Sequence, residues 1–151
     1  MDAIDRKILR IIQKDACVSI SAIASEVGLS QSPCWKRLKE LAAQGVIKRR
    51  VALLDPSKLG LQMTVFVSIQ VGEHSDSALA RFAAEVASME EVMDFYRLAG
   101  DADYGLRVVA ADAAAFDAFY KRLIALMPLK SVLSRFALEV IKSETAFPVR
   151  G

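Results

Sequence analysis

The sequence predicts an α+β protein: an N-terminal helix-turn-helix domain with a winged-helix-like character and a C-terminal ferredoxin-like β-α-β-β-α-β domain. Two observations predict this fold. Residues 1–45 show helical periodicity interrupted by glycines, whereas residues 63–141 alternate between strand and helix periodicity. The predicted domains are residues 1–54 and 63–151, joined by a linker over residues 55–62.

The first predicted helix covers Asp2–Lys14. Its apolar side contains Ile4, Ile8, Leu9, Ile11 and Ile12. A stripe of this kind favours packing across the two helices that follow.

The stretch from Ser19 to Ile47 predicts a helix, a tight turn and a second helix. Ser19 can cap the first helix through its hydroxyl, and Gly28 can end it with positive φ. Ser30 or Ser32 can cap the second helix, Pro33 suits its first turn, and Gly45 ends it. Ile20, Ile23, Ala24 and Val27, then Cys34, Leu38 and Leu41, are the expected inward residues.

The outward residues at the start of the second helix are polar and basic, as in a helix that enters the major groove of DNA. Gln and Arg side chains can bond base edges, whereas Lys suits phosphates. A helical hairpin with a merely solvated basic face is the alternative. The candidate DNA-contacting residues are Ser30, Gln31, Ser32, Trp35, Lys36, Arg37, Lys39 and Arg49.

Two of these residues have a second interpretation. Trp35 can instead pack, partly buried, near the first helix. Arg37 can instead support the fold through a local carboxylate such as that of Glu40.

Residues 46–54 predict a short strand that carries Lys48, Arg49 and Arg50. This basic triplet either touches phosphate or is a solvated edge. Asp55-Pro56-Ser57 predicts a turn before a short connector over residues 58–62.

The second domain is predicted from its periodicity. Met63, Val65, Val67, Ile69 and Val71 share one strand face. The remaining strands are expected at residues 92–99, 104–110 and 132–141, with helices at 77–88 and, capped by Asp112, up to Met127. Residues 72–76 break the first strand, and a turn over residues 100–103 joins the middle two. The expected inward helical residues are Ala78, Leu79, Phe82, Ala83 and Val86, then Phe116, Phe119, Tyr120, Leu123, Ile124 and Met127.

The predicted sheet is apolar on both faces. Phe66 lies opposite Val65 and Val67, and the second strand places Val92, Tyr96 and Leu98 against Met93 and Phe95. An apolar face that no helix covers indicates a partner. We therefore expect two such sheets to pack face to face in a homodimer.

Composition indicates where the chain acts. Residues 1–60 carry 11 Lys and Arg against 6 Asp and Glu, a net charge of +5, and the remainder carries 9 against 12, a net charge of −3. This asymmetry supports a basic, DNA-contacting first domain. Cys17 and Cys34 form no metal or redox spacing, and no cofactor is expected. The charged N-terminus and the absence of a long apolar run predict a cytoplasmic protein without membrane contact.

The order of these parts resembles the Lrp/AsnC, or feast/famine, family of regulators over nearly the whole chain. The resemblance is carried by residues 3–9, 27–30, 32–34, 37–38, 44–47, 54–56, 59–60, 100–104 and 140–142. It implies a transcription regulator that binds double-stranded DNA and has a C-terminal domain that senses a small molecule. It also implies dimers that assemble into tetramers or octamers.

The resemblance further implies a free amino acid effector, bound between dimers near the Gly-x-x-Asp turn. Position by position, it points to Leu98, Ala99, Gly100, Asp101, Asp103, Tyr104 and Ser134. Ala99 departs from the family pattern, in which a hydroxyl residue is frequent, and Ser134 replaces a common threonine. The alternative is that Asp101 and Asp103 only stabilise the hairpin turn.

Two other functions are compatible with parts of this sequence. Turn carboxylates can serve an enzyme, but the chain lacks a nucleophile–base or phosphate-loop arrangement and has a single histidine, His74, expected in a solvated loop, so we expect no enzyme. An architectural DNA-organising protein of the same fold, with no amino acid effector, is the alternative function.

Overall fold

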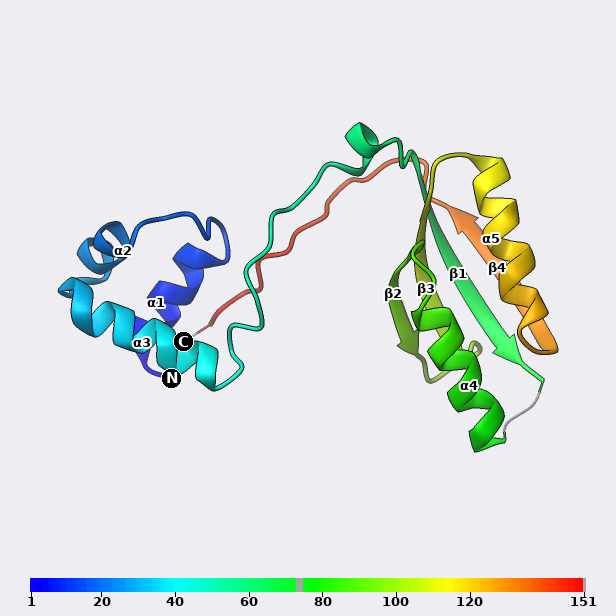
Figure 1. The fold of residues 1–151 in the computed structure, drawn as a ribbon, viewed down its shortest axis with the longest axis horizontal. Coiled ribbons are helices and arrows are strands. Elements are labelled where there is room, and N and C mark those ends of the chain that lie inside the picture. Colours follow the sequence, from blue (N-terminus) through cyan, green and yellow to red (C-terminus); the bar gives the residue numbers. More distant parts are fainter. Residues whose placement is uncertain (73–74, 151) are drawn as a thin grey trace. The chain divides into compact units, whose positions relative to one another are not determined.

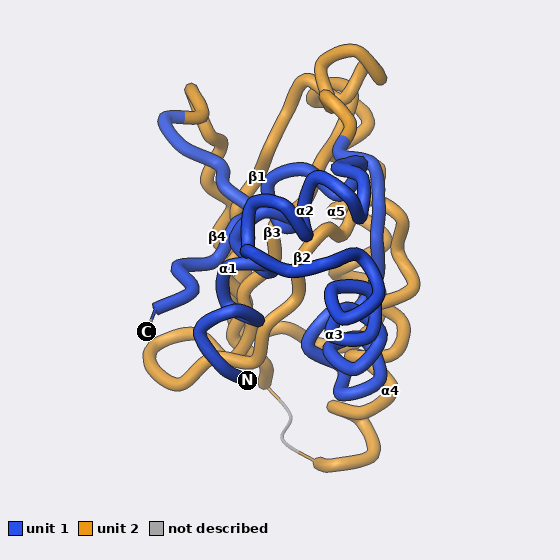
Figure 2. The backbone as a smooth tube through the Cα atoms, turned by 90° about the vertical axis from the view of Figure 1, so that its left-hand side faces the viewer, with its two compact units in different colours: residues 1–53, 141–151 blue, residues 54–140 orange. Residues whose placement is uncertain are grey.

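The structure, a computed structural model, describes residues 1–72 and 75–150 and forms two compact units. Unit 1 comprises Met1–Leu53 and Ile141–Gly151, and unit 2 comprises Leu54–Val140 (Figure 2). The residues after 140 therefore group with the N-terminal unit, whereas the sequence predicted a single domain over residues 63–151. The expected break over residues 72–76 lies partly, and His74 wholly, outside the described residues. Within the described ranges, no helix has the length and apolarity needed to cross a membrane.

Unit 1 contains helices α1 (Ala3–Ile12), α2 (Ile20–Val27) and α3 (Gln31–Ala43). α1 begins with a capping box, because Asp2 accepts a hydrogen bond from the Asp5 backbone and Asp5 accepts one from the Asp2 backbone. It ends two residues before the predicted Lys14, in a turn. The buried core of the three helices consists of Ile8, Ile23, Ala24, Val27, Cys34 and Leu38.

The turn between α2 and α3 has the predicted chemistry. The Ser19 hydroxyl accepts a hydrogen bond from the Ala22 N–H at 3.1 Å, and Gly28 ends α2 with φ of 74°. Ser30 is the N-cap of α3, although its hydroxyl makes no capping hydrogen bond. Pro33 lies in the first turn, and Gly45 follows α3 with φ of 74°.

The predicted strand over residues 46–54 is not formed. This segment pairs with none of the described strands, and a β-strand forms only where a neighbouring strand supplies its hydrogen bonds. The following turn is a short 3-10 helix, η1 (Pro56–Leu59), where the Asp55 carboxylate accepts hydrogen bonds from the backbone and hydroxyl of Ser57.

Unit 2 is an antiparallel sheet covered on one face by two helices (Figure 1). Its elements are β1 (Met63–Val71), α4 (Asp76–Ala87), β2 (Val92–Arg97), β3 (Tyr104–Ala110), α5 (Ala113–Ala125) and β4 (Leu129–Phe136). The strand order β2-β3-β1-β4 is that of the predicted ferredoxin-like fold. The Asp112 carboxylate caps α5 by accepting from the Ala115 N–H at 2.8 Å.

The bounds of β4 and the burial of Ile124 differ from expectation. β4 begins three residues before the predicted Val132 and ends at Phe136, because its pairing with β1 extends from Val71 to Val65. Ile124 is 42% exposed, so it lies at the margin of the inward face of α5. Phe82, Val86, Phe119 and Leu123 form the buried contact between the helices and the sheet.

A β-bulge explains why the predicted sides of β2 were wrong. Val92 pairs with Val108 and Asp94 with Arg107, so Met93 is an extra residue in the ladder. Val92 and Phe95 consequently pack against the core, whereas Met93 and Tyr96 are exposed. Strict alternation had placed Val92 and Tyr96 on one face.

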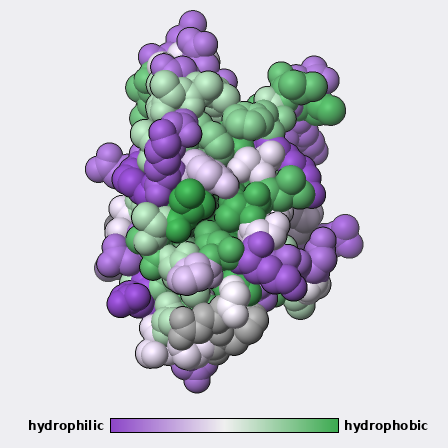
Figure 3. Space-filling view, turned by 90° about the vertical axis from the view of Figure 1, so that its right-hand side faces the viewer, coloured by the Kyte–Doolittle hydropathy of each residue, from purple (hydrophilic) through white to green (hydrophobic). Residues whose placement is uncertain are grey.

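The sheet face away from the helices remains open. We call it the open face and define it by Phe66, Tyr96, Leu98 and Leu133, which are between 45% and 61% exposed. Register places Phe66 beside Arg107 and Arg135, and the Arg107–Asp94 ion pair lies among these apolar side chains. The side of the molecule drawn in Figure 3 has hydrophobic surface through its middle and mostly hydrophilic surface around it.

Candidate nucleic-acid interface and effector site

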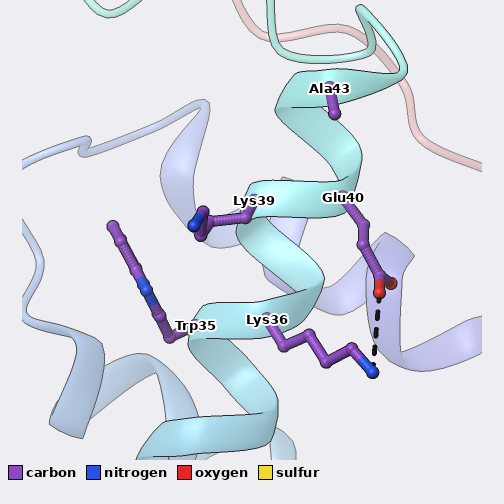
Figure 4. Close-up of a pocket in the computed structure, with 5 residues that line it drawn as sticks. All are labelled: Trp35, Lys36, Lys39, Glu40 and Ala43. Carbon is purple, nitrogen blue, oxygen red and sulfur yellow. Dashed lines mark ion pairs between the residues drawn. The ribbon is translucent and has the colours of Figure 1, made fainter.

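The outer face of α3 is exposed and polar. Its buried inner face, formed by Cys34, Leu38 and Leu41, fixes which side chains point outward. The predicted Ser30, Gln31, Ser32, Trp35, Lys36 and Lys39 are all exposed. Figure 4 shows Trp35 and Lys39 projecting to one side of the helix, while Lys36 and Glu40 lie on the other as an ion pair of 4.0 Å.

Trp35 lies on this outer face and is 50% exposed. A flat aromatic side chain left half in solvent between lysines suits contact with a ligand better than core packing. The structure therefore shows Trp35 half exposed on the outer face, and its contact with DNA stays a prediction.

Arg37 is turned toward α1. Its Nη1 atom donates to Asp2 Oδ2 at 2.7 Å and to Asp5 Oδ1 at 2.8 Å, and its side chain is 30% exposed. The expected local partner Glu40 instead faces Lys36. Arg37 therefore joins the start of α1 to the middle of α3.

This cluster shifts two pKa values. The Asp5 backbone hydrogen bond and then the Arg37 guanidinium lower the pKa of Asp2. Hydrogen bonds from Arg37 to Asp5 and Asp2 raise the pKa of the guanidinium above its ordinary value. The sequence signal was the Asp-x-x-Asp start of α1, which predicts a capping box and so two carboxylates at one helix end.

Arg49 is separate from α3 in sequence and lies exposed in the extended segment that follows it. A basic residue there suits a phosphate contact.

In unit 2, the predicted effector turn is tied to the end of β1. The Leu98 N–H donates to the Asp103 carbonyl at 2.8 Å, and the Asp103 N–H donates to the Ile69 carbonyl at 2.9 Å. The Asp103 carboxylate accepts from the Val71 N–H at 2.8 Å, and the Gln70 side chain donates to the Asp101 carbonyl. Gly100 has φ of 145°, which favours glycine.

An open groove of about 330 Å³ lies beside this turn. It is lined by Gln70, Val71, Gly72, Asp101, Asp103 and Lys130. The sequence prediction missed Gln70 and Lys130. Strand order was the available signal, because antiparallel pairing brings the start of β4 beside the end of β1.

The structure does not bring all of the predicted effector residues together. Leu98, Ala99, Gly100 and Asp101 are exposed in the turn. The Tyr104 ring is buried in the core, against Phe82 and Phe95. Ser134 lies on β4 and pairs with Val67 of β1. Because β1 separates β4 from β3, Ser134 is two strand spacings, roughly 10 Å, from β3.

Two protein-family models match the chain. A model described as the Lrp/AsnC ligand binding domain matches residues 64–147, and a winged helix-turn-helix DNA-binding model matches residues 1–48. Together these matches cover both units.

Curated relatives match over the full length. The chain is 47% identical to the DNA-binding transcriptional activator DecR of Escherichia coli K12, over 99% of each chain. It is 43% identical to the glutamate uptake regulatory protein of Zymomonas mobilis, over 99% of this chain and 91% of the relative.

Solved structures share the fold. An AsnC family transcriptional regulator from Agrobacterium tumefaciens superposes with a TM-score of 0.95 at 52% identity, over 99% of this chain and 97% of that one. A transcriptional regulator from Neisseria meningitidis, crystallised with L-Met, superposes with a TM-score of 0.94 at 31% identity, with the same coverage.

Proposed function

Because this chain belongs to the Lrp/AsnC family of DNA-binding transcription regulators, we propose that α3 reads an operator in the major groove and that the turn over residues 98–103 helps to bind a free amino acid. The observation that carries the DNA-binding role is the exposed outer face of α3, held in place by a buried inner face. Gln31 and Ser32 are exposed and can bond base edges, while Lys36, Lys39 and Arg49 suit phosphates. A regulator of transcription acts on the chromosome, so we place it in the cytoplasm.

The effector turn offers complementary charges to an amino acid. Asp101 is exposed and can receive an ammonium group, while Lys130, in the same groove, can receive a carboxylate. One oxygen of Asp103 is already used by the Val71 N–H, which leaves its other oxygen for a ligand. The relatives support this class of ligand, because one is named for glutamate uptake and another was solved with L-Met.

The open face supports a homodimer. Its apolar side chains are exposed in a single chain, and packing two such faces together removes them from water. A dimer also presents two α3 helices to two half-sites, as dimeric helix-turn-helix proteins do. Ser134, remote from the turn of its own chain, is free to complete the effector site of another subunit in a larger assembly.

The DNA-binding role is tested by selecting duplexes from a randomised pool with the full-length protein and measuring their affinities by fluorescence anisotropy. Gln31→Ala should weaken binding to the selected duplex by about 1–3 kcal/mol and relax the sequence preference of the protein. Lys121→Ala is the matched control, because this exposed lysine lies on α5 and pairs with Asp117. Equal affinity of the wild-type protein for selected and unrelated duplexes would reject sequence-specific recognition.

The architectural alternative is separated from a sensor by ligand binding. Calorimetric titration with each of the twenty amino acids should reveal at least one that binds. Asp101→Ala should lower the affinity for that amino acid. No heat with any of the twenty at millimolar concentration would favour the architectural alternative.

A further inference from the structure

The last residues of the chain belong to the DNA-binding unit, although the sequence assigns them to the sensing domain. Residues 141–151 group with residues 1–53 by their contacts (Figure 2). The chain therefore leaves unit 1 after Leu53 and returns to it at Ile141. Unit 2 is consequently connected to unit 1 by two covalent segments.

The contact with α1 is made through the main chain of this tail. The Gln13 side-chain amide donates to the Phe147 carbonyl at 2.9 Å, and its oxygen accepts from the Phe147 N–H, also at 2.9 Å. One glutamine thus satisfies both main-chain groups of one residue, as a neighbouring strand would. This arrangement needs a donor and an acceptor at position 13 and no particular side chain at position 147.

A second contact sets the register of the tail. The Arg10 guanidinium donates to the Val149 carbonyl through Nε at 3.1 Å and Nη2 at 2.9 Å. Carbonyls two residues apart on an extended chain point to the same edge, and residues three apart on a helix share a face. The carbonyls of residues 147 and 149 therefore face Gln13, the C-cap of α1, and Arg10, which lies in its last turn.

The tail also lines a groove within unit 1. Thr145, Phe147 and Val149 border it together with Leu9, Ile12 and residues 13–17 and 46–53. The tail thus lies by both the end of α1 and the extended segment that follows α3.

We propose that residues 143–149 form a clasp that holds the DNA-binding unit through Gln13 and Arg10, and that this clasp is the second connection by which the sensing unit controls operator affinity. The clasp follows β4 after a short connection over residues 137–142, so a change at β4 reaches α1 through this connection and the clasp as well as through the linker. Because the tail is tethered, its docking is intramolecular and depends on the length and state of that connection.

The test compares full-length variants. Gln13→Ala removes both hydrogen bonds to Phe147, and Gln13→Glu keeps an acceptor but removes the donor. Gln62→Ala is the matched control, since Gln62 is exposed in the linker. A chain ending at Lys142 removes the clasp, and one ending at Val149 retains it.

The first readout, hydrogen exchange of the Phe147 amide, needs no DNA. Exchange should rise about tenfold in Gln13→Ala, as expected for losing these bonds, and stay unchanged in Gln62→Ala. The second readout is affinity for the duplex selected by the wild-type protein, with and without the amino acid that binds. The chain ending at Lys142 should bind this duplex at least about tenfold more weakly and lose its response to the amino acid, while its sedimentation as a dimer is unchanged.

Unchanged exchange in Gln13→Ala would overturn the clasp. Wild-type operator affinity and wild-type response in the chain ending at Lys142 would overturn its control function. If the wild-type protein selects no duplex, the proposed function fails while the exchange measurement still decides whether the clasp exists.

Discussion

The guanidinium of Arg37 is held by the Asp2 and Asp5 carboxylates, so its substitution tests the fold of unit 1 as well as DNA contact. We expect Arg37→Ala to lower the thermal midpoint of the protein and its operator affinity together, because α1 and α3 lose their charged link. Lys36→Ala should lower operator affinity alone and reduce the slope of log affinity against log salt by about 1, as for loss of one phosphate contact.

Differential scanning fluorimetry and anisotropy over a salt series measure both effects. Lys121→Ala serves as the control lysine. An unchanged midpoint in Arg37→Ala, with operator affinity lost, would assign Arg37 to DNA and not to the link with α1.

Asp2 gives the same cluster a dependence on pH. Its pKa is lowered in the folded chain, first by the Asp5 backbone hydrogen bond and then by Arg37. A lowered carboxyl pKa contributes stability that is present above the ordinary aspartate pKa of about 3.9 and is lost as the pH falls through the lowered value. Asp2→Asn retains a capping side chain but not the charge. The variant should be less stable than the wild type at pH 6, and the gap should close toward pH 2.5; a gap constant over this range would contradict the link.

Among the elements, α5 shows how the sensing unit is held together. Phe119 is fully buried between α5 and the sheet. Phe119→Ala should reduce the free energy of unfolding by about 3–5 kcal/mol, through lost burial and a cavity. Phe119→Leu should lose less because it fills more of the space. Urea denaturation followed by circular dichroism measures both, and a loss below about 1 kcal/mol would show that the sheet and helix close around the gap.

The elements also show what the sequence could predict. β1 and β3 have the predicted bounds, because buried residues alternate with less buried ones along β1 and over the first five residues of β3. β2 was assigned the wrong sides because the bulge at Met93 is a property of its pairing with β3 and leaves no mark on local periodicity. The segment over residues 46–54 has the composition of a strand but no partner strand, and composition alone does not supply one.

In the candidate site, too, the sequence could predict some residues and not others. Helical spacing was sufficient to place Gln31, Lys36 and Lys39 on the outer face of α3. The partners of Arg37 lie more than 30 residues away in sequence, so only the packing of α1 on α3 identifies them. The same holds for the approach of Lys130 to the effector turn, which depends on strand order.

For the whole molecule, the open face predicts dimerisation. Tyr96→Asp or Leu133→Asp should convert the dimer to a monomer, because each places a charge in an apolar interface that desolvates it. Ile124→Asp is the control, since Ile124 is a comparably exposed apolar residue on α5. Sedimentation equilibrium should give the open-face variants at most half the mass of the wild-type protein. A wild-type mass for both would place the interface elsewhere.

In the proposed function, one chain couples recognition of DNA to recognition of an amino acid. The most direct measurement is the affinity of the full-length protein for its selected duplex, by anisotropy, with and without each of the twenty amino acids. Coupling requires a ligand that binds two states with different affinity, and typical coupling of about 1–3 kcal/mol changes operator affinity by about 5-fold to 150-fold. We predict such a change with at least one amino acid, and its loss in Asp101→Ala. An operator affinity that none of the twenty alters would contradict the account.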